Sequence, residues 1–184
     1  MESWISGRFD DGVFEPGAVE LFPWYGVRTR PNHENVAAMV LEGKGYAPYL
    51  PVYSLRRRRS DNSMVKSERP LFPGYMFCRF DAKKRLPILM TTGVISVVSF
   101  GREPAPIPDE EIEAVKAVLR SGLPAEPCAY LQEGQRVRVT YGSLEGVEGI
   151  LVKKKNQCRM VISVTMLQRS ISVEIEGERL AALS

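Results

Sequence analysis

The sequence predicts a two-domain α+β protein, in which a domain of mixed strands and helices precedes a small all-β barrel. Strand and helix patterns alternate over residues 21–122. Residues 123–132 contain prolines and alanines typical of a linker, and residues 133–184 hold short strand patterns separated by glycines. A chain of 184 residues has room for two small domains.

The first twenty residues differ from the rest of the chain. Residues 1–20 are rich in Gly, Asp and Glu and show no sustained apolar period. Such a segment buries too little apolar surface to offset the entropy lost on ordering. We therefore expect a disordered acidic tail, with a regulatory arm as the alternative, and a folded chain that begins near Leu21.

Four extended segments are predicted in the first domain. Residues 24–28 have the aromatic and β-branched content of a strand, and so do residues 71–80 and 93–100. Residues 46–55 are also extended, but Pro48 and other prolines restrict them to an irregular or edge strand.

Helix signals lie between these strands. Asn32 is a plausible N-cap for a helix that Gly43 ends, and Asp81 opens a short helix that Pro87 should end or kink. Pro108, followed by three acidic residues, starts a last helix that ends at Gly122. The apolar face of that helix consists of Ile112, Val115 and Leu119.

The second domain has the pattern of a barrel. Val137 and Val139 alternate with arginines, and short apolar runs follow at residues 150–152, 160–164 and 171–175. Closing several short strands into a barrel removes exposed sheet edges. We expect strands throughout this domain and no helical alternative.

Composition argues against an enzyme. His33 is the only histidine, and no nucleophile–base set, phosphate-binding loop or paired carboxylate site stands out. Cys78, Cys128 and Cys158 are far apart and lack metal-ligand spacing. We therefore predict no catalytic residue, no metal and no cofactor.

Other features indicate where the chain works. No apolar run approaches the roughly 20 residues that span a bilayer, and no secretory signal is visible. Three free thiols suit a reducing compartment. We expect a cytoplasmic monomer without membrane contact.

Four motifs resemble the NusG family of transcription elongation factors. They are Trp24-Tyr25-Gly26-Val27, residues 67–77 around Phe72-Pro73-Gly74-Tyr75, residues 104–112, and a KOW-like run of glycines and valines over residues 134–149. The resemblance implies an NGN-type α/β sandwich, with an antiparallel sheet and about three helices, followed by an SH3-like KOW barrel.

Other segments are closer to specialised members of that family. Residues 29–34, 50–53, 153–156 and 168–170 resemble the UpxY antiterminators, which are related to RfaH. This likeness implies a factor that suppresses pausing and termination at specific operons. The alternatives are a housekeeping NusG acting in elongation and Rho-dependent termination, and an RNA-binding KOW protein of ribosomal type.

The resemblance also assigns a polymerase-binding surface. It implies that the largest-subunit clamp helices of RNA polymerase bind Phe72, Pro73, Gly74 and Tyr75, with Trp24 and Tyr25 nearby. Buried aromatic side chains dominate interface energetics, which agrees with this role. The alternative is that these aromatics belong only to the core.

Basic residues suggest contact with nucleic acid. Arg56, Arg57, Arg58 and Arg59 form a run that would bind phosphates or the non-template DNA strand. The alternative is a solvated hairpin loop. His33 is expected on a helix surface, and by resemblance it would lie near DNA.

One barrel loop differs from the family pattern. Met166, Leu167, Gln168 and Arg169 replace the Ile-Phe-Gly-Arg by which NusG barrels bind Rho or a small-subunit ribosomal protein. Gln enters left-handed backbone conformations less freely than Gly, and Leu is a smaller anchor than Phe. The sequence thus argues against Rho binding and leaves the ribosomal partner open, with barrel core as the alternative role.

Overall fold

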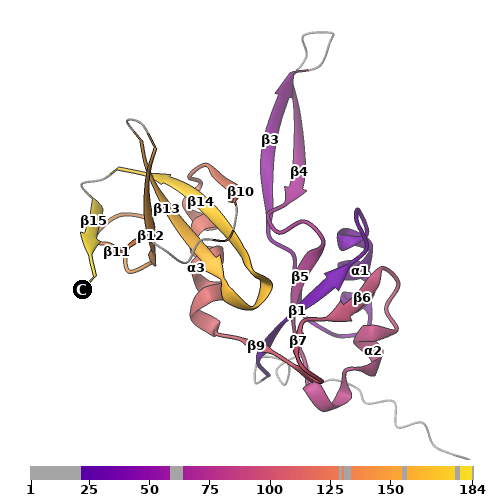
Figure 1. Cartoon of the computed structure of the whole chain (residues 1–184). Helices are drawn as coiled ribbons and strands as arrows, with labels where there is room; N and C mark the ends of the chain where they lie inside the picture. The colour runs from indigo at the N-terminus through magenta and orange to yellow at the C-terminus, as the bar shows by residue number, and fades with distance from the viewer. Residues whose placement is uncertain are drawn as a thin grey trace, which may run out of the picture.

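A computed structural model describes residues 22–58, 64–128, 130, 134–154, 157–176 and 179–183. It contains a mixed N-terminal part and a β-rich C-terminal part, with helix α3 (Asp109–Ser121) between them (Figure 1). No described helix is long and apolar enough to cross a membrane.

An antiparallel sheet forms the centre of the N-terminal part. Its strands run in the order β2 (Pro48–Tyr49), β5 (Tyr75–Arg79), β1 (Trp24–Thr29) and β6 (Val94–Val97), and β9 (Pro106–Ile107) also pairs with β1. Because side chains alternate along a strand, neighbouring residues of β1 point to opposite faces.

Residues with special backbone conformations lie before the first helix and after α3. Helix α1 (Glu34–Gly43) has His33 rather than Asn32 at its N-cap position, and Asn32 instead takes a positive φ of 62°. Asn tolerates that conformation, so it serves the turn that precedes the helix. At the end of α3, Gly122 adopts the left-handed conformation that the sequence predicted for a C-cap.

Pro87 lies at the start of a helix, whereas the sequence predicted that it ends or kinks the helix opened by Asp81. Asp81 caps the short 3₁₀ helix η2 (Ala82–Lys84) by accepting a hydrogen bond from the Lys83 N–H at 2.9 Å. Pro87 then lies in the first turn of α2 (Leu86–Leu89) and does not end a helix. Proline fits there because first-turn N–H groups have no partner within the helix.

Two hairpins extend from the sheet. Strand β3 (Val52–Arg58) pairs with β4 (Met64–Pro70), and their ribbon projects away from the rest of the molecule in Figure 1. A shorter hairpin joins β7 (Ser99–Phe100) to β8 (Glu103–Pro104). The strand predicted at 71–80 starts only at β5, because residues 71–74 form a turn in which Gly74 has a φ of 81°.

Six antiparallel strands form the C-terminal sheet, as the valine alternation predicted. Their order is β10 (Ala125–Cys128), β14 (Arg169–Ile175), β13 (Gln157–Val164), β12 (Glu148–Lys154), β11 (Gln135–Val139) and β15 (Leu180–Ala182). Strand β10 lies in the segment expected to be a linker, and it pairs with β14 along its full length.

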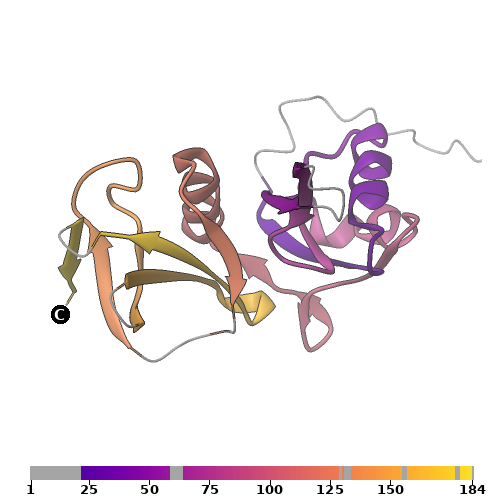
Figure 2. The ribbon, with the colours of Figure 1, turned by 90° about the horizontal axis from the view of Figure 1, so that it is seen from above.

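The first sheet has two apolar faces. Tyr25, Val27, Met76 and Cys78 pack on one face with residues of α1 and α2. On the other face, Trp24, Phe72 and Phe77 belong to a cluster that continues through α3 into the C-terminal sheet. Figure 2 shows α1 on one side of β1, with α3 and the C-terminal sheet on the other.

Candidate docking surface

The turn between β4 and β5 presents two aromatic residues to one face of the sheet. Phe72 is 1% exposed, Tyr75 is half-buried and Pro73 is exposed. The Tyr75 N–H donates to the Phe72 carbonyl at 3.0 Å, and the Thr29 N–H donates to the Gly74 carbonyl at 2.9 Å. These bonds fasten the turn to itself and to β1.

Aromatic rings continue from this turn across the sheet. Phe72 meets Phe77 edge to face at 5.5 Å between ring centroids. Tyr49 stacks near Phe77 at 6.1 Å and meets Trp24 at 6.2 Å. We call Trp24, Tyr49, Phe72, Tyr75 and Phe77 the aromatic face.

Two cations lie over the Trp24 end of the aromatic face. The Arg79 guanidinium lies 4.8 Å from the Trp24 ring centroid, and the Lys116 ammonium of α3 lies 5.1 Å from it. Within the described residues, Trp24 Nε1 and the Tyr49 hydroxyl are buried without a hydrogen-bond partner. Burial raises the pKa of Tyr49 to about 12.

The structure separates Tyr25 from the other predicted polymerase-binding residues. Tyr25 points to the opposite face and packs on Phe80 at 4.8 Å between ring centroids. Burial, and to a lesser degree the charge of Asp81, raises the pKa of Tyr25. Strand alternation makes this separation from Trp24 unavoidable.

A loop of the C-terminal sheet covers the middle of the aromatic face. It consists of the 3₁₀ helix η3 (Thr165–Leu167) with Gln168 and Arg169, and η3 lies against β9. Leu167 is 5% exposed and packs over Gly26, where an added Cβ would lie 2.6 Å from Leu167 Cδ2. Gly26 is therefore the hole that receives the Leu167 side chain.

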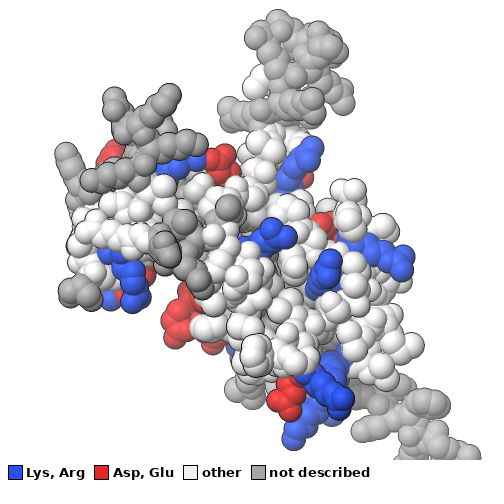
Figure 3. All heavy atoms as spheres, viewed as in Figure 1, with Lys and Arg blue, Asp and Glu red and all other residues white. Residues whose placement is uncertain are grey.

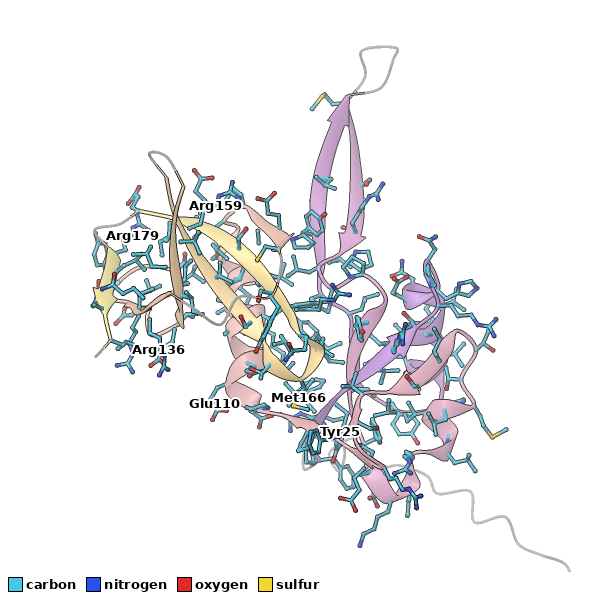
Figure 4. All side chains as sticks on the ribbon, viewed as in Figure 1. Tyr25, Glu110, Arg136, Arg159, Met166 and Arg179 are labelled. Atoms are coloured by element: carbon cyan, nitrogen blue, oxygen red, sulfur yellow. The ribbon has the colours of Figure 1, made fainter. Side chains whose placement is uncertain are left out.

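Polar contacts lie beside the Leu167–Gly26 contact. Glu111 of α3 accepts hydrogen bonds from the Thr165 N–H at 3.1 Å and from the Thr165 hydroxyl at 2.8 Å. The Arg169 guanidinium lies 5.9 Å from the Tyr75 ring centroid. In Figure 4, the labelled Met166 lies at the end of the C-terminal sheet nearest β1 and β9.

Gln168 adopts the backbone conformation in which glycine is favoured. Its φ is 51° and its ψ is 43°, which is left-handed. The Gln168 Nε2 donates to the Thr165 carbonyl at 3.0 Å, and this local bond helps to offset the strain of the left-handed conformation. Gln168 therefore holds the left-handed conformation without being a glycine.

The candidate nucleic-acid residues are only partly described. Arg56, Arg57 and Arg58 lie on β3, but their side chains and all of Arg59 are outside the described residues. His33 is exposed at the start of α1, and its Nδ1 lies 3.0 Å from the Pro31 carbonyl. Figure 3 shows described Lys and Arg side chains spread over the N-terminal part on one face, not in a single patch.

The described residues show no reactive centre. They contain no group of three or more His, Cys, Asp or Glu side chains that could hold a metal ion. Burial raises the pKa of the Cys78 thiol to about 12, which keeps it protonated and unreactive at neutral pH. The arrangement is suited to docking a macromolecule through apolar surface.

Sequence reasoning missed three parts of this site. They are Gly26 as the hole, Tyr49 as a ring of the aromatic face, and Lys116 as the cation of α3. The edge-strand tyrosine was visible in the sequence, but its partner rings come from strands that are distant in the chain.

Comparison with known proteins identifies relatives of this chain. Residues 22–116 match a family described as "Transcription termination factor nusG". Two proteins named "Transcription termination/antitermination protein NusG" are each 25% identical, one from Borreliella burgdorferi over 85% of this chain and 96% of its own length. The other, from Thermus thermophilus, covers 83% of this chain and 94% of its own length.

A solved structure shares the fold. It is described as "Domain interaction in Thermotoga maritima NusG" and aligns with a TM-score of 0.53 at 18% identity. The alignment covers 90% of this chain and 99% of the other.

Proposed function

The chain belongs to the NusG family, and from that premise we propose that its aromatic face is a docking site for the clamp helices of the largest RNA polymerase subunit. The family consists of transcription factors, so this chain is a NusG-like termination/antitermination factor and not an enzyme. A clamp-helix partner would approach the sheet from the side that α3 and the barrel loop now occupy.

One observation carries the proposal. The aromatic face is apolar, yet part of its cover comes from Leu167 in a loop of the C-terminal sheet and not from the helices of the N-terminal part. An apolar surface covered by a detachable element suits exchange between an internal and an external partner. Polymerase would bind only molecules in which the Leu167 loop has left Gly26, so its apparent affinity falls with the closed fraction.

We further propose antitermination at specific operons in preference to a housekeeping role. The loop that would recruit Rho in housekeeping relatives carries Leu167 and Gln168, and here it is engaged by the chain's own sheet. Binding to the elongating state of polymerase better than to the paused state would then suppress pausing. Housekeeping elongation and Rho-dependent termination is the second candidate, favoured by the names of both relatives.

Three further contacts complete the proposal. The projecting β3–β4 hairpin would reach the non-template DNA strand through Arg56, Arg57 and Arg58 of β3, together with Arg59, which lies outside the described residues. A freed barrel loop, Met166 to Arg169, would bind a small-subunit ribosomal protein at the raised effective concentration that tethering provides. His33 is the remaining candidate for DNA contact.

Affinity for core RNA polymerase tests the function. We expect Tyr75→Ala and Phe72→Ala to weaken binding by about tenfold or more, since a central aromatic anchor contributes about 2 kcal/mol or more. Met39→Ala is the matched control, because Met39 is 71% exposed on α1 behind the opposite face. Circular dichroism must show each variant folded.

Two results would count against the proposal. Equal loss of affinity in Met39→Ala would mean that polymerase does not choose the aromatic face. A wild-type protein that binds structured RNA but no polymerase would instead support the RNA-binding KOW alternative.

A further inference from the structure

We infer that Glu34 is a positioning residue, which holds the Phe72-Pro73-Gly74-Tyr75 turn in the conformation that binds the partner. The inference rests on the proposed docking function of that turn. Glu34 belongs to α1, a helix on the opposite face of the sheet, so no motif in the sequence links it to residues 72–75.

Glu34 is a buried carboxylate with a defined target. It is 5% exposed, and its Oε1 accepts a hydrogen bond from the Gly74 N–H at 2.9 Å. A carboxylate is costly to bury without a partner. It is the acidic residue in the first turn of α1, where an acidic side chain interacts favourably with the helix dipole.

The bond acts where the turn is least constrained by its own sequence. Gly74 has a φ of 81°, and an added Cβ would meet only the Thr29 carbonyl oxygen, at 3.9 Å. Glycine is thus required there by backbone conformation and not by lack of space. A glycine in this region has many accessible conformations, so an external contact is needed to select one.

Both backbone polar groups of Gly74 form hydrogen bonds. Glu34 accepts from its N–H, and the Thr29 N–H donates to its carbonyl at 2.9 Å. The flanking bond from the Tyr75 N–H to the Phe72 carbonyl closes the turn at 3.0 Å. Without Glu34, the Gly74 N–H would lose this acceptor. The Phe72 and Tyr75 rings could then change their relative orientation.

A role limited to helix α1 explains the geometry less well. The side chain of Glu34 reaches a residue 40 positions away and not a backbone group of its own helix. The N-cap residue His33 makes no side-chain capping bond, so α1 begins without one. The carboxylate is therefore directed at the turn.

The experiment compares Glu34→Ala and Glu34→Gln with wild type in the full chain. The first readout is the Gly74 amide in ¹H–¹⁵N spectra, both its chemical shift and its hydrogen-exchange rate. The second readout is the dissociation constant for core RNA polymerase. Glu42→Ala is the matched control, an exposed glutamate in the last turn of the same helix.

Glu34→Ala should shift the Gly74 amide signal and speed its exchange about tenfold or more, in line with the loss of a charge-assisted bond. Polymerase affinity should fall by a similar factor. Glu34→Gln retains an amide oxygen that accepts, so it should restore most of both readouts. Amides in the middle of α1 should exchange as in wild type.

Three outcomes would overturn the inference. They are an unchanged Gly74 amide in Glu34→Ala, unchanged polymerase affinity despite a changed amide, and equal effects from Glu42→Ala. Failure of the proposed function is separately visible, because then the wild-type protein itself would not bind polymerase. If Glu34→Ala does not fold, Glu34→Met replaces it, since methionine fills a similar volume without a carboxylate oxygen to accept the bond. A folded Glu34→Met with the wild-type Gly74 amide and wild-type polymerase affinity would contradict the inference.

Discussion

The two faces of the N-terminal sheet are equally buried but differently covered. One face packs on α1 and α2, which lie in the same part of the chain as the strands they cover. The other face packs on α3 and on the Leu167 loop of the second sheet. The first cover comes from the N-terminal part itself, whereas the Leu167 loop in the second cover belongs to the C-terminal sheet.

This difference explains why burial alone does not identify a core. Tyr25 and Trp24 are neighbours in β1 and both are 6% exposed. Tyr25 is enclosed by helices of its own domain, while Trp24 belongs to the face shared with α3 and the barrel. The identity of the covering element therefore says more about function than the exposed fraction does.

The largest expected effect on stability is at the face that α1 and α2 cover. Leu41→Ala on α1 removes a side chain that is 0% exposed, and we expect it to lower the free energy of unfolding by about 2–5 kcal/mol. Chemical denaturation followed by circular dichroism measures the change. A loss below about 1 kcal/mol would mean that this face is not a tightly packed core.

A smaller effect is expected from filling the hole on the other face. Gly26→Val places side-chain atoms where Leu167 now lies, and overpacking of this kind costs about 1–3 kcal/mol. The proposed exchange has the barrel loop leave this face, so the strain should appear as loss of the contact between the loop and β1 and not as unfolding. Chemical shifts of residues 165–169 would report detachment while those of α1 stay unchanged.

The same contact allows a test of coupling. Gly26→Ala and Leu167→Ala should be less harmful together than the sum of the single changes, since the smaller side chain at 167 makes room for the new methyl group. Strictly additive effects on unfolding free energy would show that the two residues do not meet in solution.

The smallest effect is expected at Tyr49. Its hydroxyl is buried without a partner in the described structure, so Tyr49→Phe should leave stability at pH 7 unchanged or slightly raised. Burial raises the pKa of Tyr49 from 10.0 to about 12, which disfavours the ionised form in the folded state. The unfolded chain therefore ionises at this residue before the folded chain does, so folding stability is unaffected by this ionisation below pH 10 and falls as the pH rises from 10 toward 12.

Thermal unfolding between about pH 9 and pH 12, for wild type beside Tyr49→Phe, measures this loss of stability. The wild type should lose melting temperature more steeply above pH 10 than the variant does. Parallel curves would show that Tyr49 is not buried in the folded state.

Local signals in the sequence predicted most of the fold. The Pro108 start and Gly122 stop of α3 are confirmed, as are the strand at Trp24 and the β-rich C-terminal part. Pro87 was assigned wrongly, because a proline signal fits both the end of one helix and the first turn of the next. Strand β10 was missed because the prolines and alanines of residues 123–132 resemble a linker, although an edge strand tolerates Pro127.

The candidate site was harder to predict because its contacts are long-range. Trp24 and Tyr25 were predicted to lie on one polymerase-binding surface. Strand alternation alone places these neighbours on opposite faces, so the sequence could have separated them. The Gly26–Leu167 and Glu34–Gly74 contacts join residues far apart in the chain. Nothing in either local sequence indicates its partner.

Hydrogen exchange of the full chain, alone and bound to core RNA polymerase, would show whether the aromatic face exchanges the barrel loop for polymerase. We expect polymerase to protect residues 72–77 and β1, while amides of residues 165–169 exchange faster as the barrel loop leaves Gly26. Protection confined to α1 and α2, with the barrel loop unchanged, would show that polymerase does not bind the aromatic face.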